Sequence, residues 1–215
     1  MKKVMIIGAN GQIARIVEDR ILKETNDVEL TLFLRNANRV ANLASNDRVT
    51  IVEGDAEDQA SLEKAMAGQD IVYVAMVDHG VDNRITKNII VAMQKNHVDR
   101  VISSNILGIY NEVPGAFGKW NRKQVSWGLQ AAVNADQLLK NSGLTYTTIR
   151  IPWLNDHPEV KYQVTHQDEE YVGVSGSRQS VADVIVKMIK DPTTYANDSI
   201  GLADPATQGL DRPVY

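Results

Sequence analysis

The sequence predicts an α/β protein built on a doubly wound parallel sheet, with a small C-terminal substrate lobe. Two observations predict this class: short apolar runs alternate with amphipathic helical runs, and a glycine-rich turn joins the first run of each kind. Such alternation places parallel strands side by side with helices on both faces, because crossovers between parallel strands are right-handed.

The first strand and the first helix are the clearest pair. Residues 2–8, KKVMIIG, are apolar and end at a glycine, as expected of a buried strand. Residues 13–24, IARIVEDRILKE, follow directly and repeat isoleucine and valine on one helical face. The chain therefore begins with a strand, a tight turn and a helix.

The following runs repeat this order. The run at 70–77 is almost continuously apolar, which is typical of a central parallel strand covered on both faces. Gly68 and Gly143 are placed to end the helices before them. The strands are expected at 28–35, 49–55, 70–77, 100–106 and 144–152, and the helices at 61–69, 82–96 and 122–143.

The last third of the chain is less regular. A helical stripe of apolar residues covers 181–189, and Ser180 and Asp183 stand before it at the spacing of a capping box. Residues 153–179 and 195–215 are polar and turn-rich, so we expect them to form the small lobe and a surface tail. We expect one domain over residues 1–215.

Composition excludes several classes of function. The chain has 23 Lys and Arg against 27 Asp and Glu, a net charge of −4, which disfavours a nucleic-acid surface. It has no cysteine and no pair of histidines at ligand spacing, so we expect no metal site. No apolar run approaches the roughly 20 residues that span a bilayer. We expect a cytoplasmic protein whose partner is a small-molecule acceptor, without membrane or nucleic acid; the sequence leaves a homodimer open.

The glycine turn has the context of a phosphate-binding site. In IIGANGQIAR, Gly8 allows the tight turn after the strand, and Gly11 lets the backbone approach a pyrophosphate. Ala14 is small enough for the helix to pack near the strand, and the amides at the start of the helix would bind the anion. This is the Rossmann pattern of dinucleotide binding; the alternative is a simple tight turn.

The end of the second strand indicates which dinucleotide binds. An NAD site usually places an acidic residue there to hold the ribose 2′-hydroxyl. Here the sequence reads FLRNANR, so Arg35 and Arg39 are present without an acid between them. Guanidinium groups suit a 2′-phosphate, which favours NADP over NAD; the alternative is a pair of solvated surface arginines.

Two carboxylates follow the third strand. Asp55 lies where the adenine is expected, and a carboxylate or main-chain acceptor there could take a hydrogen bond from its amino group. The alternative is that Asp55 and Asp58 cap the next helix. Asp58 fits the capping role better.

Several segments together resemble one family: IIGANGQIAR, FLRNANR, VEGDAEDQASLEKAMAGQDIVYVAM, SGLTYTTIRIP and SGSRQSVADVIVKMI. They are similar to the atypical short-chain dehydrogenase/reductases of the NAD(P)-binding, NmrA-like branch, near which small flavin, biliverdin and quinone reductases lie. The resemblance covers nearly the whole chain. It implies a Rossmann fold and an NADP cofactor, and it does not identify the substrate.

The resemblance also implies which residues form the site. The turn would hold the pyrophosphate, Arg35 with support from Arg39 would hold the 2′-phosphate, and SRQSVAD would be structural. The implied cofactor residues are Gly8, Asn10, Gly11, Gln12 and Ile13 at the turn, Asp55 and Ala56 at the adenine, Ala75 and Met76 at the nicotinamide ribose, Ser103, and Ile151 and Pro152 near the nicotinamide. Ser103 and Ser104 match the family's serine position.

The sequence departs from the superfamily in its acid/base residues. Common members carry Y-x-x-x-K, in which the lysine lowers the pKa of a tyrosine that donates a proton. None of the seven tyrosines here has a lysine four residues later. Alcohol dehydrogenation by a Tyr acid/base is therefore disfavoured.

We therefore expect an NADPH-dependent oxidoreductase that transfers hydride to a small acceptor such as a flavin, a quinone or an activated carbonyl. Hydride transfer belongs to the cofactor, and the protein has mainly to hold the two reactants together. Ser104 and Tyr110 are the candidate catalytic residues. The structural alternative is a strand-end hydrogen bond for Ser104 and packing in a lid for Tyr110. The rival function is a non-catalytic NADP-binding sensor or regulator.

Overall fold

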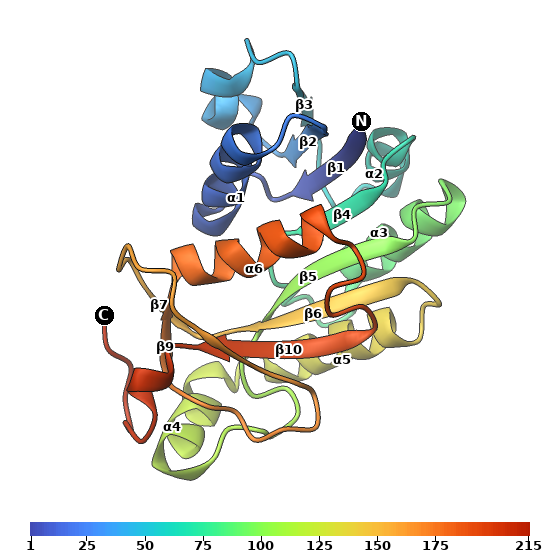
Figure 1. The fold of residues 1–215 in the computed structure, drawn as a ribbon. Coiled ribbons are helices and arrows are strands. Elements are labelled where there is room, and N and C mark those ends of the chain that lie inside the picture. The colour runs from blue at the N-terminus through green and yellow to red at the C-terminus, as the bar shows by residue number, and fades with distance from the viewer.

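The computed structural model describes residues 1–215 and centres on an eight-stranded sheet in the order β3-β2-β1-β4-β5-β6-β10-β8 (Figure 1). All neighbouring strands run parallel except β8, which is antiparallel to β10. The strands of this sheet are β1 (Lys2–Ile7), β2 (Val28–Leu34), β3 (Val49–Glu53), β4 (Ile71–Val74), β5 (Arg100–Ile106), β6 (Thr145–Ile151), β8 (Gln163–Thr165) and β10 (Asp198–Ala203). The predicted α/β class with a parallel, doubly wound sheet is confirmed.

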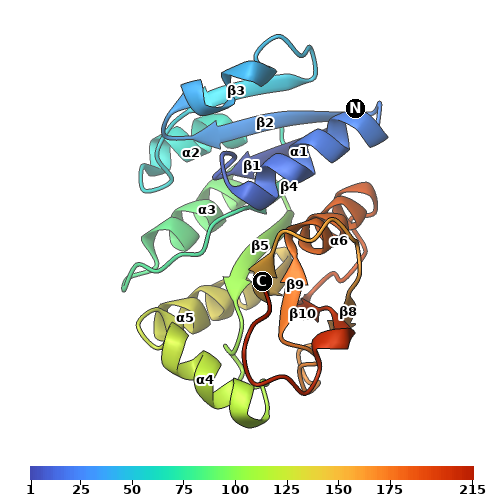
Figure 2. The ribbon, with the colours of Figure 1, turned by 90° about the vertical axis from the view of Figure 1, so that its left-hand side faces the viewer.

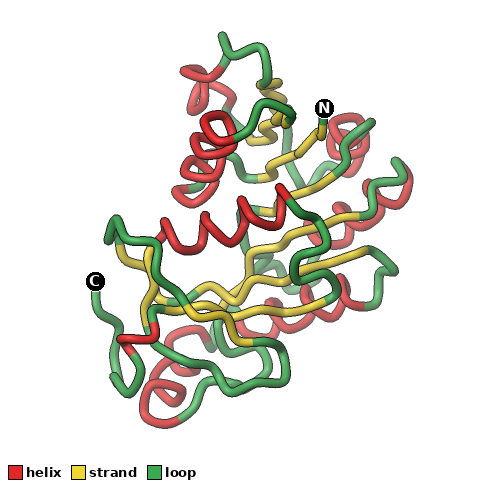
Figure 3. The backbone as a smooth tube through the Cα atoms, in the orientation of Figure 1, coloured by secondary structure: helices red, strands yellow, loops and turns green.

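Helices cover both faces of the sheet (Figures 1 and 3). They are α1 (Gln12–Glu24), α2 (Gln59–Met66), α3 (Arg84–Lys95), α4 (Gly115–Val125), α5 (Leu129–Lys140) and α6 (Arg178–Lys190), with 3-10 turns η1 (Ala37–Leu43) and η2 (Pro205–Thr207). Two short strands, β7 (Trp153–Asn155) and β9 (Ser175–Ser177), pair with each other outside the main sheet. No helix has the length and apolar character that crossing a bilayer demands.

The alternation of side chains in β1 divides the core into two layers. Val4 and Ile6 pack with the residues of α1 and α6, whereas Met5 and Ile7 pack with those of α2 and α3. Successive side chains of a strand point to opposite faces, and burial on both faces explains why these runs are apolar throughout. The helices of the two layers pack on the faces of the sheet, so the ends of its parallel strands remain open.

The predicted helix over 122–143 is wrong in its extent. The structure has two helices there, α4 and α5, which are separated at residues 126–128. Gly128 caps α5 and lies against His79: a Cβ at Gly128 would lie 2.7 Å from His79 Nδ1. α4 begins at Gly115, before the predicted start of the helix, and Gly118 allows it to pass close to Val113, whose carbonyl oxygen would lie 2.0 Å from an added Cβ.

Two expectations for the last third also need correction. Residues 198–203 lie in the main sheet as β10 and not in a surface tail, because their neighbour β6 leaves one edge free for pairing. Ser180 and Asp183 do not cap α6. The capping side chain is Ser177, which accepts a hydrogen bond from Ser180 N at 3.0 Å.

Glu18 of α1 is a buried acid. Its residue is 1 % exposed, Oε1 forms no hydrogen bond, and the nearest charge is the Arg15 guanidinium at 3.4 Å. Burial raises the pKa of Glu18 to about 8, although Arg15 acts in the opposite direction. The folded protein therefore holds a proton on Glu18 that the unfolded chain releases near its ordinary pKa of 4.5.

We expect Glu18→Gln to remove a pH dependence of stability. Because the folded pKa is raised, the wild type loses stability as the pH rises from about 4.5 to about 8. The neutral glutamine should abolish this loss, and the variant should be more stable at pH 9 by on the order of 5 kcal/mol. Urea unfolding at pH 5, 7 and 9 measures the effect. Parallel pH profiles for the two proteins would contradict the prediction.

Candidate functional site

The glycine turn after β1 requires a glycine at position 8. Gly8 has a φ of +81°, in the left-handed region that side chains other than glycine rarely adopt. Its N–H donates to Phe33 O at 2.9 Å, which fixes the turn beside the end of β2, and Gly11 N donates to Gly8 O at 2.9 Å. The turn thus brings the start of α1 to the open edge of the sheet.

The first amides of α1 are free. Gly11 caps the helix without any side-chain hydrogen bond, and the N–H groups of Gln12 and Ile13 have no acceptor within the protein. The first turn contains no acidic residue. Unpaired amides at the positive end of the helix dipole bind an anion such as a phosphate.

A cavity of about 550 Å³ opens beside this turn. It lies between the turn, the end of β2, the loop from β3 to α2 and the end of β4, at the carboxyl edge of the sheet. Figure 2 shows β3, β2, β1 and β4 one below the other. Ligands of open α/β sheets bind at this edge. The predicted residues that line it are Gly8, Asn10, Gly11, Arg35, Arg39, Asp55, Ala56, Ala75 and Met76.

Two arginines at the cavity carry unpaired charge. Arg35 and Arg39 are exposed, and neither forms an ion pair or a side-chain hydrogen bond. Arg39 belongs to η1, whose first residues are held by Asn36 Oδ1 and by a Glu53 carboxylate that accepts from Ala37 N at 2.8 Å. The turn of η1 brings Arg39 back to the cavity beside Arg35. Two free guanidinium groups are suited to a phosphate.

The loop after β3 forms the opposite wall. Asp55 Oδ1 accepts from Glu57 N at 3.0 Å, which fixes the loop while Asp55 itself lines the cavity. Asp58 caps α2 by accepting from Ala60 N at 3.0 Å, as its position predicted. The Ala56 carbonyl oxygen accepts from the Asn88 amide at 3.2 Å.

Sequence reasoning missed part of the wall. Gly54 allows the loop to pass over Phe33, because a Cβ at Gly54 would lie 2.5 Å from the Phe33 ring. Its position directly after a strand was a signal that could have been used, whereas Ile85 comes from the start of α3 and carried no signal. The unpredicted lining residues are Ile7, Phe33, Leu34, Asn36, Gly54, Glu57 and Ile85.

The other predicted cofactor residues lie outside the cavity. Gln12 and Ile13 form the first turn of α1, directly after Gly11, which lines the cavity. Ser103 is partly exposed and pairs with Val74, the last residue of β4. Ile151 packs beside the core of the α1 and α6 face, and Pro152 packs against Gly176.

The two candidate catalytic hydroxyls are both engaged elsewhere. Ser104 is buried, and its hydroxyl lies 3.3 Å from the Tyr73 hydroxyl within the core. Tyr110 donates to the buried Asp136 carboxylate at 2.5 Å. Burial, and then this hydrogen bond, raise the pKa of Tyr110 above its ordinary value. Neither hydroxyl lines the cavity.

Known proteins resemble this chain in sequence and in fold. A family model described as NAD(P)H-binding matches residues 8–192. A short-chain dehydrogenase/reductase from Veillonella parvula, solved in complex with NADP, is 28 % identical with a TM-score of 0.92, covering 100 % of this chain and 99 % of its own. A Rossmann-fold NAD(P)-binding family protein from Shigella flexneri is 33 % identical over 100 % of this chain and 99 % of its own, with a TM-score of 0.79. ChuY, an anaerobillin reductase from Escherichia coli, shares the fold at 21 % identity, over 99 % of this chain and 100 % of its own, with a TM-score of 0.79.

Proposed function

The chain belongs to the NAD(P)H-binding family, and from this premise we propose that it is an NADPH-dependent oxidoreductase. The proposed reaction transfers hydride to a small acceptor such as a flavin, a quinone or an activated carbonyl, without a Tyr-Lys acid/base pair. The observation that carries the proposal is the pair of unpaired guanidinium groups on the same cavity as the glycine turn.

The residues around the cavity fit a dinucleotide. The free amides of Gln12 and Ile13 suit its pyrophosphate, and the close approach that Gly11 permits leaves room for it: an added Cβ would lie 3.3 Å from Gly8 O. Asp55 and Ala56 would border the adenine. When bound, the nicotinamide supplies the hydride, and the protein's own contribution is to hold and orient the two reactants.

The arginines support NADPH over NADH. Arg35 and Arg39 have no carboxylate to neutralise them, so a ligand phosphate would gain charge-assisted hydrogen bonds without breaking existing ones. The end of β2, at Leu34, offers no acid for the 2′-hydroxyl of NADH. A cofactor with a 2′-phosphate therefore explains both the positive charge of the two arginines and the absence of an acidic residue at the end of β2.

We expect Arg35→Ala to weaken NADPH binding by about 1–3 kcal/mol, the scale of a lost charged hydrogen bond. NADH binding should change much less, because NADH carries no 2′-phosphate. Calorimetric titration of both nucleotides measures the difference. Arg122→Ala, on the exposed face of α4, is the matched control and should change neither affinity. Equal losses for NADPH and NADH would show that Arg35 does not read the phosphate.

The acceptor class follows from the missing acid/base pair. A flavin or a quinone is protonated easily after hydride transfer, so solvent suffices as proton donor. NADPH oxidation measured with flavin mononucleotide, menadione and an enone tests turnover.

The hydroxyls of Ser104 and Tyr110 are bound to other side chains, which favours the second candidate, an NADP-binding sensor. NADPH binding without turnover of any acceptor would support the sensor.

A further inference from the structure

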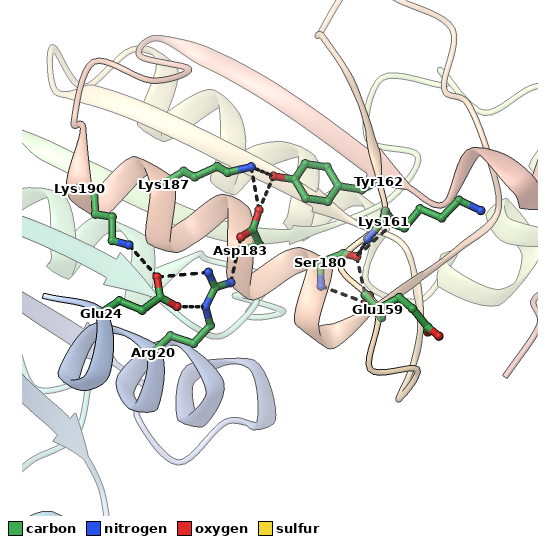
Figure 4. A network of polar contacts seen from close by, with 10 residues as sticks. Arg20, Glu24, Glu159, Lys161, Tyr162, Ser180, Asp183, Lys187 and Lys190 are labelled. Atoms are coloured by element: carbon green, nitrogen blue, oxygen red, sulfur yellow. Dashed lines mark hydrogen bonds and ion pairs between the residues drawn. The ribbon is translucent and has the colours of Figure 1, made fainter.

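Asp183 joins three elements that are far apart in the sequence (Figure 4). Its carboxylate accepts hydrogen bonds from Arg20 Nη1 of α1 at 3.0 Å and from the Tyr162 hydroxyl at 2.7 Å, and it pairs with Lys187 Nζ of its own helix α6 at 2.9 Å. Arg20 is in turn held by Glu24, which also binds Lys190 Nζ at 2.6 Å. One carboxylate thus connects α1, α6 and the segment that carries Tyr162.

The joint that Asp183 forms with Arg20, Tyr162 and Lys187 is largely shielded from water. The Asp183 side chain is 11 % exposed and Arg20 is 22 % exposed, so their interaction is screened less than that of a surface pair. Although burial acts to raise it, hydrogen bonds from Lys187, Tyr162 and Arg20 keep the pKa of Asp183 below its ordinary value. Asp183 therefore remains charged and bound to all three partners at neutral pH.

Residues 156–162, which we call the strap, connect β7 to β8. α6 holds the strap along one helical face. Ser177 Oγ donates to Glu159 O at 2.8 Å, and Ser180 Oγ accepts from Lys161 N at 3.0 Å. Ser177, Ser180 and Asp183 follow one another at three-residue spacing, so they lie on the same side of α6. The segment SRQSVAD, residues 177–183, therefore supplies the three side chains that hold the strap.

The joint includes the helix that starts at the glycine turn. α1 starts at the free amides of the glycine turn, and Arg20 lies on the same helix as those amides. The strap continues from β7, which extends the path of β6 past the carboxyl edge of the sheet. Asp183 is thus a polar contact between the helix that starts at the glycine turn and the strap.

We propose that Asp183 is a positioning residue, which couples nucleotide binding at the start of α1 to the position of the strap. The inference rests on the proposed function, since it needs NADPH bound at the turn. A ligand that orders α1 restrains Arg20, Arg20 restrains Asp183, and Asp183 restrains the Tyr162 hydroxyl. By linkage, ordering the strap favours nucleotide binding by the same factor.

Hydrogen exchange of the full chain with and without saturating NADPH tests this coupling. In the wild type, NADPH should slow exchange in residues 8–14 and also in the strap, there by about fivefold or more. Tyr162→Phe keeps the ring and removes only the hydroxyl, and Asp183→Asn keeps the shape and removes the charge. Both variants should keep the protection of residues 8–14 and lose at least half of the protection of the strap.

Asp156→Asn is the matched control. It removes the Asp156–Arg178 ion pair of 2.8 Å, which also joins the strap to α6 but does not reach α1. This variant should keep the NADPH-dependent protection of the strap. A strap that is equally protected in Tyr162→Phe and wild type, or one that does not respond to NADPH while residues 8–14 do, would overturn the inference alone. If residues 8–14 show no protection by NADPH, the proposed function fails and the inference fails with it.

Discussion

Replacing Glu112 with alanine is expected to destabilise the protein by about 3–5 kcal/mol, because it leaves the Arg150 charge buried without its partner. Arg150 is 0 % exposed and Glu112 is 3 % exposed in their side chains, and Nη1 lies 2.9 Å from Oε1. The other contacts of Arg150 are neutral: Nη2 donates to the carbonyl oxygens of Thr165, His166 and Ser199.

Glu112 also holds the loop after β5. Its carboxylate accepts from Gly108 N and from Tyr110 N, both at 3.0 Å. The substitution therefore removes loop contacts as well as the ion pair. Urea unfolding at pH 7 measures the loss. Asp19→Ala is the matched control, since it breaks the exposed Lys23–Asp19 pair of 2.8 Å and should cost less than about 1 kcal/mol. Similar losses for both variants would contradict the assignment of Glu112 as a buried, charge-compensating residue.

Replacing Gly8 with valine is expected to weaken NADPH binding at least a hundredfold, about 2.7 kcal/mol. A β-branched residue at a φ of +81° is strained, so the turn would change shape. The new Cβ would lie 3.6 Å from Met76 Cβ, and its methyl groups would extend beside the cavity. Both effects displace the amides that we expect to meet the pyrophosphate. Calorimetric titration with NADPH measures the affinity.

Gly143→Val separates strain from the loss of the site. Gly143 has a similar φ of +79°, but an added Cβ there has nothing within 4 Å, and the residue is not part of the cavity. This control should lose stability through backbone strain while keeping its affinity for NADPH. A wild-type affinity in Gly8→Val would refute the role given to the turn.

Local sequence patterns predicted some of the residues that line the cavity and missed others. Gly8 indicates a turn because few residues other than glycine tolerate a φ of +81°, and Arg35 follows a strand whose end is visible in its apolar run. Ile85 lines the same cavity from α3, and only the packing of α3 on the sheet places it there. The hydroxyl of Ser104 follows the alternation of β5 into the core, a direction that the sequence around it did not reveal.

The sequence by itself determined the alternation of strands and helices, the glycine turn and the positions of Arg35 and Arg39 after the second strand, because each depends on residues that are close together in the chain. Only the tertiary structure decided the rest. β10 joins the sheet beside β6, Glu112 meets Arg150, and Asp183 gathers Arg20 and Tyr162. These contacts join residues separated by whole elements, so they form only after the chain has folded. A buried ion pair offsets the cost of desolvating its two charges only when both partners are brought together.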